Sequence, residues 1–172
     1  MAGFTESNIT LDFPTEKWFR FEKSVPYSPL CAFYFKEMDA CWVKILAPDK
    51  SEFYAIELKD YRSARLKEKA DDRVKIIVKK VVDTIQMFMS AHYQHTFGKT
   101  LEMEKYVDLH TGEIKAYFLT IIDIRPEDGQ LFEVMKDECL NRLKGSTTVW
   151  DGLAIHILTK TQAQKHYSEF VK

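Results

Sequence analysis

The segment "SEFYAIELKDYRS", residues 51–63, places a carboxylate and an amine two positions apart near the end of an expected strand. Successive side chains of a strand alternate between its two faces, so Glu57 and Lys59 should project from the same face. Such a pair is either an exposed ion pair, which contributes little to stability, or the working end of an active site.

A second acid, Asp39, opens the preceding expected strand in "KEMDACWVKIL". The Pro48-Asp49 turn between the two strands predicts a hairpin, which brings Asp39 to the same end as Glu57. Two neighbouring carboxylates repel unless a cation lies between them, and hard oxygen ligands favour Mg²⁺ or Mn²⁺. Lys59 beside that pair could orient a water or offset charge developing on a phosphate. The sequence therefore predicts Asp39 and Glu57 as metal ligands and all three residues as catalytic, a set suited to metal-assisted phosphodiester hydrolysis.

The surrounding sequence predicts the elements that would hold this site. After the hairpin comes a helix over about 71–93, whose apolar residues recur at three- and four-residue spacing. "IKAYFLTIIDI" predicts a strand buried on both faces, "PEDGQLFEVMKDECLNRLKG" a helix closed by Gly145, "TTVWDGLAIHIL" a further strand and "QAQKHYSEFVK" a terminal helix. "PTEKWFRFEKS" is compatible with either a short helix or a strand. This order predicts an α/β fold with a mixed central sheet flanked by helices.

An acid at the start of one strand, then (D/E)-x-K near the end of its hairpin partner, then a helix, resembles the PD-(D/E)xK nuclease superfamily. The resemblance covers about residues 36–120, and its specific part is "MDACWVKILAPDKSEFYAIELKDYR". It implies a restriction-endonuclease-like core over about 31–124, with a helix-strand-helix extension over about 126–172, in a single domain of residues 1–172. It also implies that Asp39, Glu57 and the Leu58 carbonyl bind Mg²⁺ or Mn²⁺, and that Lys59 acts on the nucleophilic water.

The chain departs from the superfamily pattern at Met38, which stands before Asp39 in place of proline. Many members add a glutamate from a helix ahead of the first core strand, for which Glu22 is the first candidate and Glu16 the second. Some members also use a glutamine on the helix after the motif, and Gln86 is available for that role.

Charge is unevenly distributed although the net charge is only −1. Between Lys59 and Lys80 nine basic residues face four acidic ones, a local charge of +5 that leaves −6 for the rest of the chain. Arg62, Arg65 and Lys67 follow the motif directly and are predicted to contact phosphates, although a run of charges at a helix start is often only a solvated face. Nucleic acid, with DNA favoured, is the expected partner.

Composition bounds the remaining possibilities. A chain of 172 residues, 45% hydrophobic and 30% charged, is typical of one globular domain. It has no apolar run long enough to cross a bilayer and no leader-like N-terminus, so we expect a cytoplasmic protein without a membrane partner. Cys31, Cys41 and Cys139 have neither paired nor metal-finger spacing and are expected to be reduced thiols.

Three functions stay open at this point. The first is a metal-dependent nuclease, which could act as a homodimer or with a partner protein. The second is a non-catalytic binding or assembly protein of the same fold, in which the site is vestigial. The third is an unrelated α/β protein-interaction module.

Overall fold

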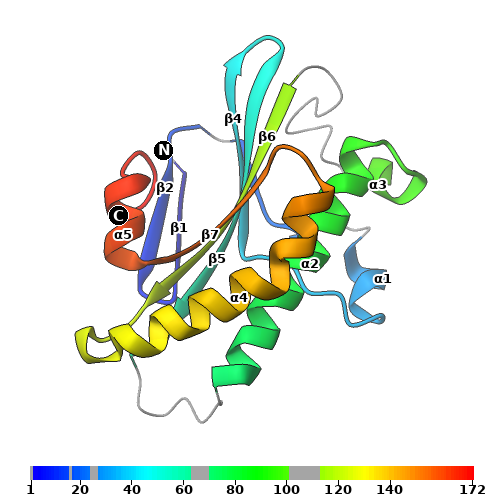
Figure 1. Cartoon of the computed structure of the whole chain (residues 1–172). Coiled ribbons are helices and arrows are strands. Elements are labelled where there is room, and N and C mark those ends of the chain that lie inside the picture. Colours follow the sequence, from blue (N-terminus) through cyan, green and yellow to red (C-terminus); the bar gives the residue numbers. More distant parts are fainter. Residues whose placement is uncertain (1, 16, 24–26, 63–69, 101–112) are drawn as a thin grey trace.

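A five-stranded mixed sheet forms the centre of the computed structural model, which describes residues 2–15, 17–23, 27–62, 70–100 and 113–172 (Figure 1). Its strands lie in chain order: β3 (Trp18–Phe19), β4 (Ala40–Ala47), β5 (Lys50–Asp60), β6 (Glu113–Asp123) and β7 (Leu153–Thr159). The first three strands are antiparallel, whereas β5, β6 and β7 run parallel to one another. The predicted α/β class with a mixed central sheet is confirmed.

The hairpin of β4 and β5 turns at Pro48-Asp49, as the sequence predicts. Ala40 pairs with Ile56 and Cys41 with Ala55, so Asp39, the residue before β4, comes beside Glu57. The long β6 is buried along most of its length because β5 and β7 flank it and both of its faces are covered.

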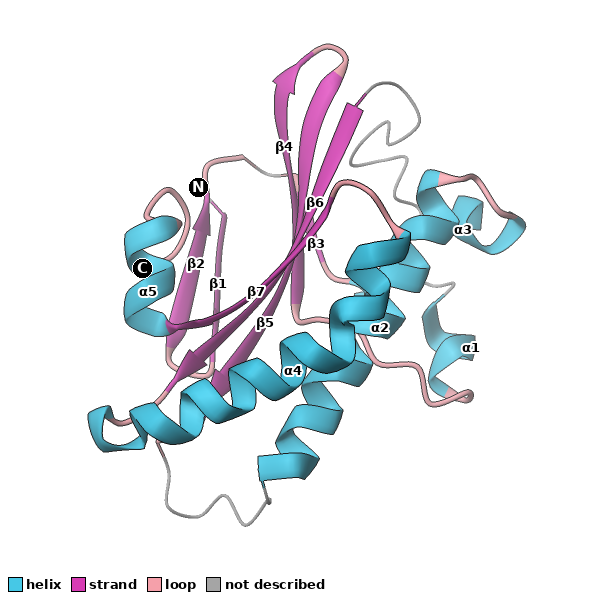
Figure 2. Cartoon of the chain, in the orientation of Figure 1, coloured by secondary structure: helices cyan, strands magenta, loops and turns pink. Residues whose placement is uncertain are grey.

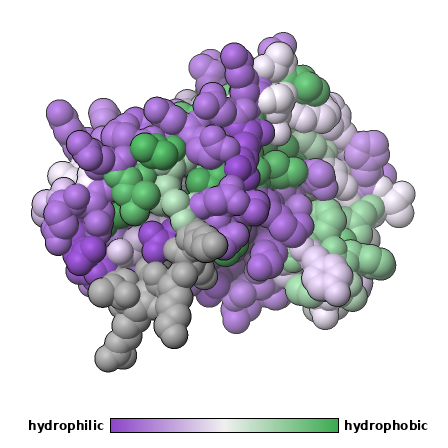
Figure 3. Space-filling view, turned by 60° about the horizontal axis from the view of Figure 1, so that its bottom comes forward, coloured by the Kyte–Doolittle hydropathy of each residue, from purple (hydrophilic) through white to green (hydrophobic). Residues whose placement is uncertain are grey.

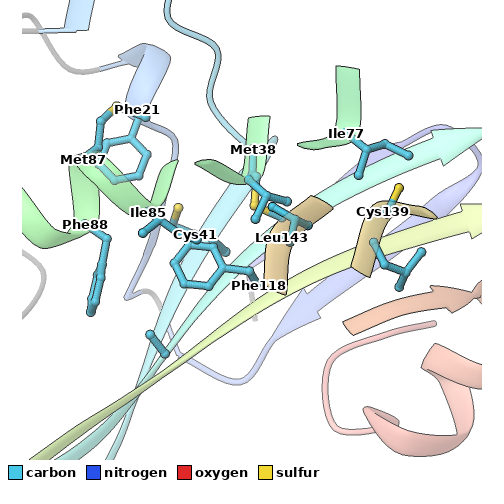
Figure 4. Close-up of a cluster of buried hydrophobic side chains, with 14 of the residues drawn as sticks. Phe21, Met38, Cys41, Ile77, Ile85, Met87, Phe88, Phe118, Cys139 and Leu143 are labelled. Atoms are coloured by element: carbon cyan, nitrogen blue, oxygen red, sulfur yellow. The ribbon is translucent and has the colours of Figure 1, made fainter. Parts of the chain in front are cut away.

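One face of the sheet is covered by α2 (Ala70–His92) and α4 (Gly129–Val149) (Figures 1 and 2). The apolar stripe of α2 packs there against alternate strand residues, including Phe53 and Phe118. Figure 4 shows part of this core, to which α2 contributes Ile77 and Ile85, β4 contributes Cys41 and α4 contributes Cys139. Ala55 belongs to the same core, so the next residue on this face of β5, Glu57, enters a largely apolar layer.

The opposite face is covered by a second, two-stranded sheet of β1 (Ala2–Glu6) and β2 (Ile9–Phe13), together with α5 (Lys160–His166) and the C-terminal segment. Ser7 and Asn8 adopt φ values of 51° and 60°, the left-handed conformation that two-residue hairpins require. An isolated bridge joins Leu11 to Val171. This hairpin was not among the predicted elements, although the alternation in "ITLDF" after an asparagine is a signal for it.

The predicted boundaries between α4 and β7 are wrong. Gly145 does not close a helix: α4 continues through it to Val149, and a side chain there would meet no neighbour. Gly152, with φ of 83°, provides the left-handed turn instead, and the last strand accordingly begins at Leu153 rather than Thr147.

The remaining elements are short. The segment "PTEKWFRFEKS" contains β3 and a 3₁₀ turn, Phe21–Lys23, and α1 (Ser28–Cys31) and α3 (Thr96–Thr100) flank the long strands and α2. The terminal helix α5 ends at His166, earlier than predicted. Because β7 pairs with β6, the C-terminal extension contributes a strand to the central sheet. Within the described ranges, no helix has the length and apolar character needed to span a bilayer.

Candidate active site

Asp39 and Glu57 converge on a lysine that the sequence analysis did not select. The Lys80 ammonium on α2 donates to Asp39 Oδ1 at 2.9 Å and to Glu57 Oε2 at 2.8 Å. The two acids therefore lie on the same face of the sheet, the condition on which the expected metal site depends, and one cation already lies between them.

Lys59 completes this group from the end of β5, with its Nζ 2.6 Å from Glu57 Oε1. The side chain of Glu57 is fully buried, whereas those of Lys59 and Lys80 are 23% and 16% exposed. Solvent thus reaches the site past the two lysines, at the end of the sheet where β5 and β6 finish. Figure 3 turns this end toward the reader: the surface is mainly hydrophilic, with apolar patches between the polar side chains.

The electrostatics of the site follow from its burial. Burial and, next, the neighbouring Asp39 carboxylate raise the pKa of Glu57 to about 7, although Lys80 and Lys59 act in the opposite direction. Burial alone would lower the pKa of Lys80, but the carboxylates of Glu57 and Asp39 outweigh it and raise that pKa. A carboxyl group that titrates near neutral pH in a partly accessible site is a common feature of functional sites.

Two polar residues of α2 fix the segment that leads into β4. Asp83 accepts a hydrogen bond from the Lys36 amide at 2.8 Å, and the buried Thr84 hydroxyl accepts one from the Met38 amide at 3.0 Å. Lys80 lies one turn earlier on the helix. α2 therefore positions Asp39 in two ways: Asp83 and Thr84 hydrogen-bond the backbone before it, and Lys80 contacts its carboxylate.

Leu58 contributes its backbone to the same region. Its amide donates to Asp39 Oδ2 at 2.7 Å, and its carbonyl accepts the Ser7 hydroxyl at 3.2 Å. The carboxylate of Asp39 is thus held through one oxygen by β5 and through the other by α2.

Glu22, the candidate additional acid, forms ion pairs with Arg20 at 3.1 Å and Lys23 at 3.5 Å. Glu37 lies between it and the site: it accepts a hydrogen bond from the Tyr27 hydroxyl, and burial raises its pKa although Lys80 acts to lower it. Glu16, the second candidate, lies outside the described residues.

Of the predicted phosphate contacts, only Arg62 lies in the described part of the chain; Arg65 and Lys67 lie outside it. The Arg62 guanidinium is held by Asp60, through contacts of 3.1 and 2.8 Å, and by Asp123 at 3.1 Å.

Gln86, the candidate helix glutamine, is exposed on α2. Lys80, six residues earlier on the same helix, is the residue whose side chain enters the site. The polar interruption of the apolar stripe at Asp83 and Thr84 was a signal that this helix face contacts polar groups, but nothing in the spacing singled out Lys80.

The two carboxylates, Asp39 and Glu57, lie on one face of the sheet and offer the oxygen ligands that a hard divalent cation prefers. Both oxygens of the buried Glu57 carboxylate already face a cation, Oε1 the ammonium of Lys59 at 2.6 Å and Oε2 that of Lys80 at 2.8 Å, as the oxygens of a metal ligand would. The described residues contain no group of three or more histidine, cysteine or acidic side chains arranged to hold a metal. A metal here would therefore depend on two carboxylates, with backbone oxygen or water completing its coordination.

No family model, no curated protein and no solved structure matches this chain. The resemblance to the PD-(D/E)xK superfamily stays a prediction that rests on the residues and their arrangement.

Proposed function

We propose that this protein is a metal-dependent nuclease that hydrolyses phosphodiester bonds of nucleic acid, with DNA the favoured substrate. One observation carries the proposal: Asp39 and Glu57 converge on a single cation position, and the ammonium of Lys59 lies beside them. Fold class alone would not support an activity, since the same architecture hosts unrelated functions.

In this proposal Asp39, Glu57 and the Leu58 carbonyl hold Mg²⁺ or Mn²⁺. The ion, when bound, supplies Lewis-acid activation of the phosphate and of a water. Lys59 reaches the solvent-accessible side of the pair, where its ammonium orients the attacking water or offsets negative charge on the phosphate. Burial of Glu57 fixes its carboxylate and removes competing water contacts.

A specific observation favours a second candidate, a non-catalytic binding protein of the same fold. Lys80 contacts both carboxylates and Lys59 contacts Glu57, so two ammonium groups balance the charge of the pair without any metal. A buried ion-pair network of this kind can serve structure alone, although its net contribution to stability is often small.

The test measures Mn²⁺ binding by calorimetry and hydrolysis of labelled single- and double-stranded DNA and RNA. Asp39→Asn should lose both activities, because it removes one of two anionic ligands. Asp72→Asn, at an exposed position on α2, is the matched control and should behave as the wild type. Wild-type protein that neither binds metal nor cleaves any substrate would favour the non-catalytic candidate. Metal binding that survives Asp39→Asn unchanged would place the metal elsewhere.

A further inference from the structure

The position of Lys80 has a consequence for metal binding that rests on the proposed function. We propose that Lys80 is an internal cation that holds the metal position in the metal-free protein, so that a divalent ion binds only by displacing it. Metal binding at this site is then an exchange of one cation for another.

The geometry supports mutual exclusion. Lys80 Nζ lies 2.9 Å from Asp39 Oδ1 and 2.8 Å from Glu57 Oε2, the oxygens by which both acids face α2. Mg²⁺ or Mn²⁺ bound to the same two oxygens would lie about 2.1 Å from each, on the side where the ammonium now sits. Two cations cannot share that space.

The charges lead to the same conclusion. The two carboxylates and the ammonium groups of Lys59 and Lys80 sum to zero when all four are ionised. A divalent ion added to that group would leave two uncompensated positive charges in a mostly buried place, which is costly. Moving one ammonium into water removes half of that excess, and a bound phosphate would offset the rest.

Lys80 also has a route out. Its side chain is 16% exposed, whereas Glu57 is fully buried and Asp39 nearly so. A lysine has a flexible four-carbon stem, so its ammonium can turn to solvent while the stem continues to cover apolar surface. Lys80 can leave the site without any movement of the two acids.

The inferred role is a positioning role. In the metal-free protein Lys80 keeps two buried carboxylates together that would otherwise repel, so the ligands stay preorganised. The same contacts weaken metal affinity, because the ion must first break two charge-assisted hydrogen bonds.

The test compares wild type with Lys80→Met, which keeps the apolar stem and removes the ammonium. Mn²⁺ binding is measured by calorimetry at pH 8, and melting temperature is measured in EDTA and in excess Mn²⁺. Lys80→Met should bind Mn²⁺ on the order of 10- to 100-fold more tightly, the value of one to two charge-assisted hydrogen bonds. It should melt lower than wild type in EDTA and recover in Mn²⁺.

Lys75→Met is the matched control, because Lys75 lies on the same helix but pairs only with exposed acids; its Mn²⁺ affinity should equal that of the wild type. If Lys80→Met does not fold, Lys80→Gln keeps a hydrogen-bond donor without the charge and should show tighter binding in the same direction.

The outcomes separate this inference from the proposed function. Tighter binding by the Lys80 variant supports the inference, including the case in which wild type shows no measurable binding. Equal or weaker binding by the variant, with wild type binding normally, overturns the inference and leaves the proposed function standing. If neither the wild type nor either Lys80 variant binds Mn²⁺, the metal site itself is overturned, and with it both proposals.

Discussion

Stability should fall as the pH rises from 5 to 8 because Glu57 loses a proton that the folded protein holds more tightly than the unfolded chain does. Burial, with Asp39 nearby, raises the pKa of Glu57 from its ordinary value of 4.5 to about 7. Between these two values the folded state binds the proton and the unfolded state does not, so the free energy of unfolding decreases with increasing pH. Below the lower value both states are protonated, and the contribution is fully present.

The magnitude follows from the width of that window. Each pKa unit corresponds to about 1.4 kcal/mol, so the full effect of Glu57 is about 3 kcal/mol. Because the side chain is fully buried, solvent screening reduces this figure little. Glu57→Gln mimics the protonated acid and cannot ionise, so it should lie within about 1 kcal/mol of wild type at pH 5. It should become the more stable protein by about 3 kcal/mol at pH 8.

Urea denaturation from pH 5 to pH 8, with EDTA throughout, measures this difference. Burial also raises the pKa of Glu37, so other groups add their own pH dependence to the stability. The difference between wild type and Glu57→Gln cancels their contributions. Glu133→Gln, at an exposed position on α4, is the control for the effect of a Glu-to-Gln substitution itself. One contrary result is that the free energies of unfolding of wild type and Glu57→Gln differ by the same amount at every pH; another is that wild type gains on the variant toward pH 8. Either result would refute the raised pKa of Glu57.

Two further changes test the hydrogen bond between Met38 and Thr84 and the role of Lys59 in hydrolysis. Thr84→Val removes the acceptor of the buried Met38 amide and should lower the free energy of unfolding, measured by urea denaturation, by about 1–3 kcal/mol. Thr84→Ser keeps the hydroxyl and should keep most of the stability. Equal losses in both variants would mean that the hydrogen bond is not the cause. Lys59→Ala should slow hydrolysis of labelled DNA on the order of 10²–10³-fold while Mn²⁺ binding persists, with Lys50→Ala at the far end of β5 as the control. An undiminished rate would exclude Lys59 from the chemistry.

The pairing of Asp39 with Glu57 could be predicted only in part from local signals. A Pro-Asp turn fixes the hairpin, and the period of two along a strand fixes which face each side chain takes. These rules act over neighbouring residues, so they need no knowledge of the rest of the fold. The face that Asp39 takes depends in addition on a register shift between Ile45 and Ala47, without which Asp39 would come opposite Leu58 instead of Glu57.

The role of Lys80 could not be predicted in that way because it depends on how α2 lies across the sheet. Helical spacing identifies an apolar face, and Lys80 stands at the edge of that face between Ile77 and Thr84. Whether such a lysine points into the core or into water is decided by the angle and register of packing, which sequence periodicity does not encode. The continuation of α4 through Gly145 has a similar origin, because a glycine that is tolerated in a helix and one that ends it look the same in sequence.

Tertiary contacts also change the meaning of the basic segment between Lys59 and Lys80. Sequence counting assigns it a charge of +5, which suggests a surface for a polyanion. In the structure Lys59 and Lys80 are engaged by the buried acids, and Arg62 is held by Asp60 and Asp123.

Lys75 and Lys79 pair with Asp71 and Asp83 on the same helix. Acids just before β4, in β5 and in β6 thus take up charge that the sequence count left unopposed. The count covers neighbours along the chain, whereas ion pairs form between neighbours in space. A nucleic acid approaching this end of the sheet would have to compete with these acids for each described lysine and for Arg62. A charge count in sequence is therefore an upper bound on the positive surface that the folded protein can offer to phosphates.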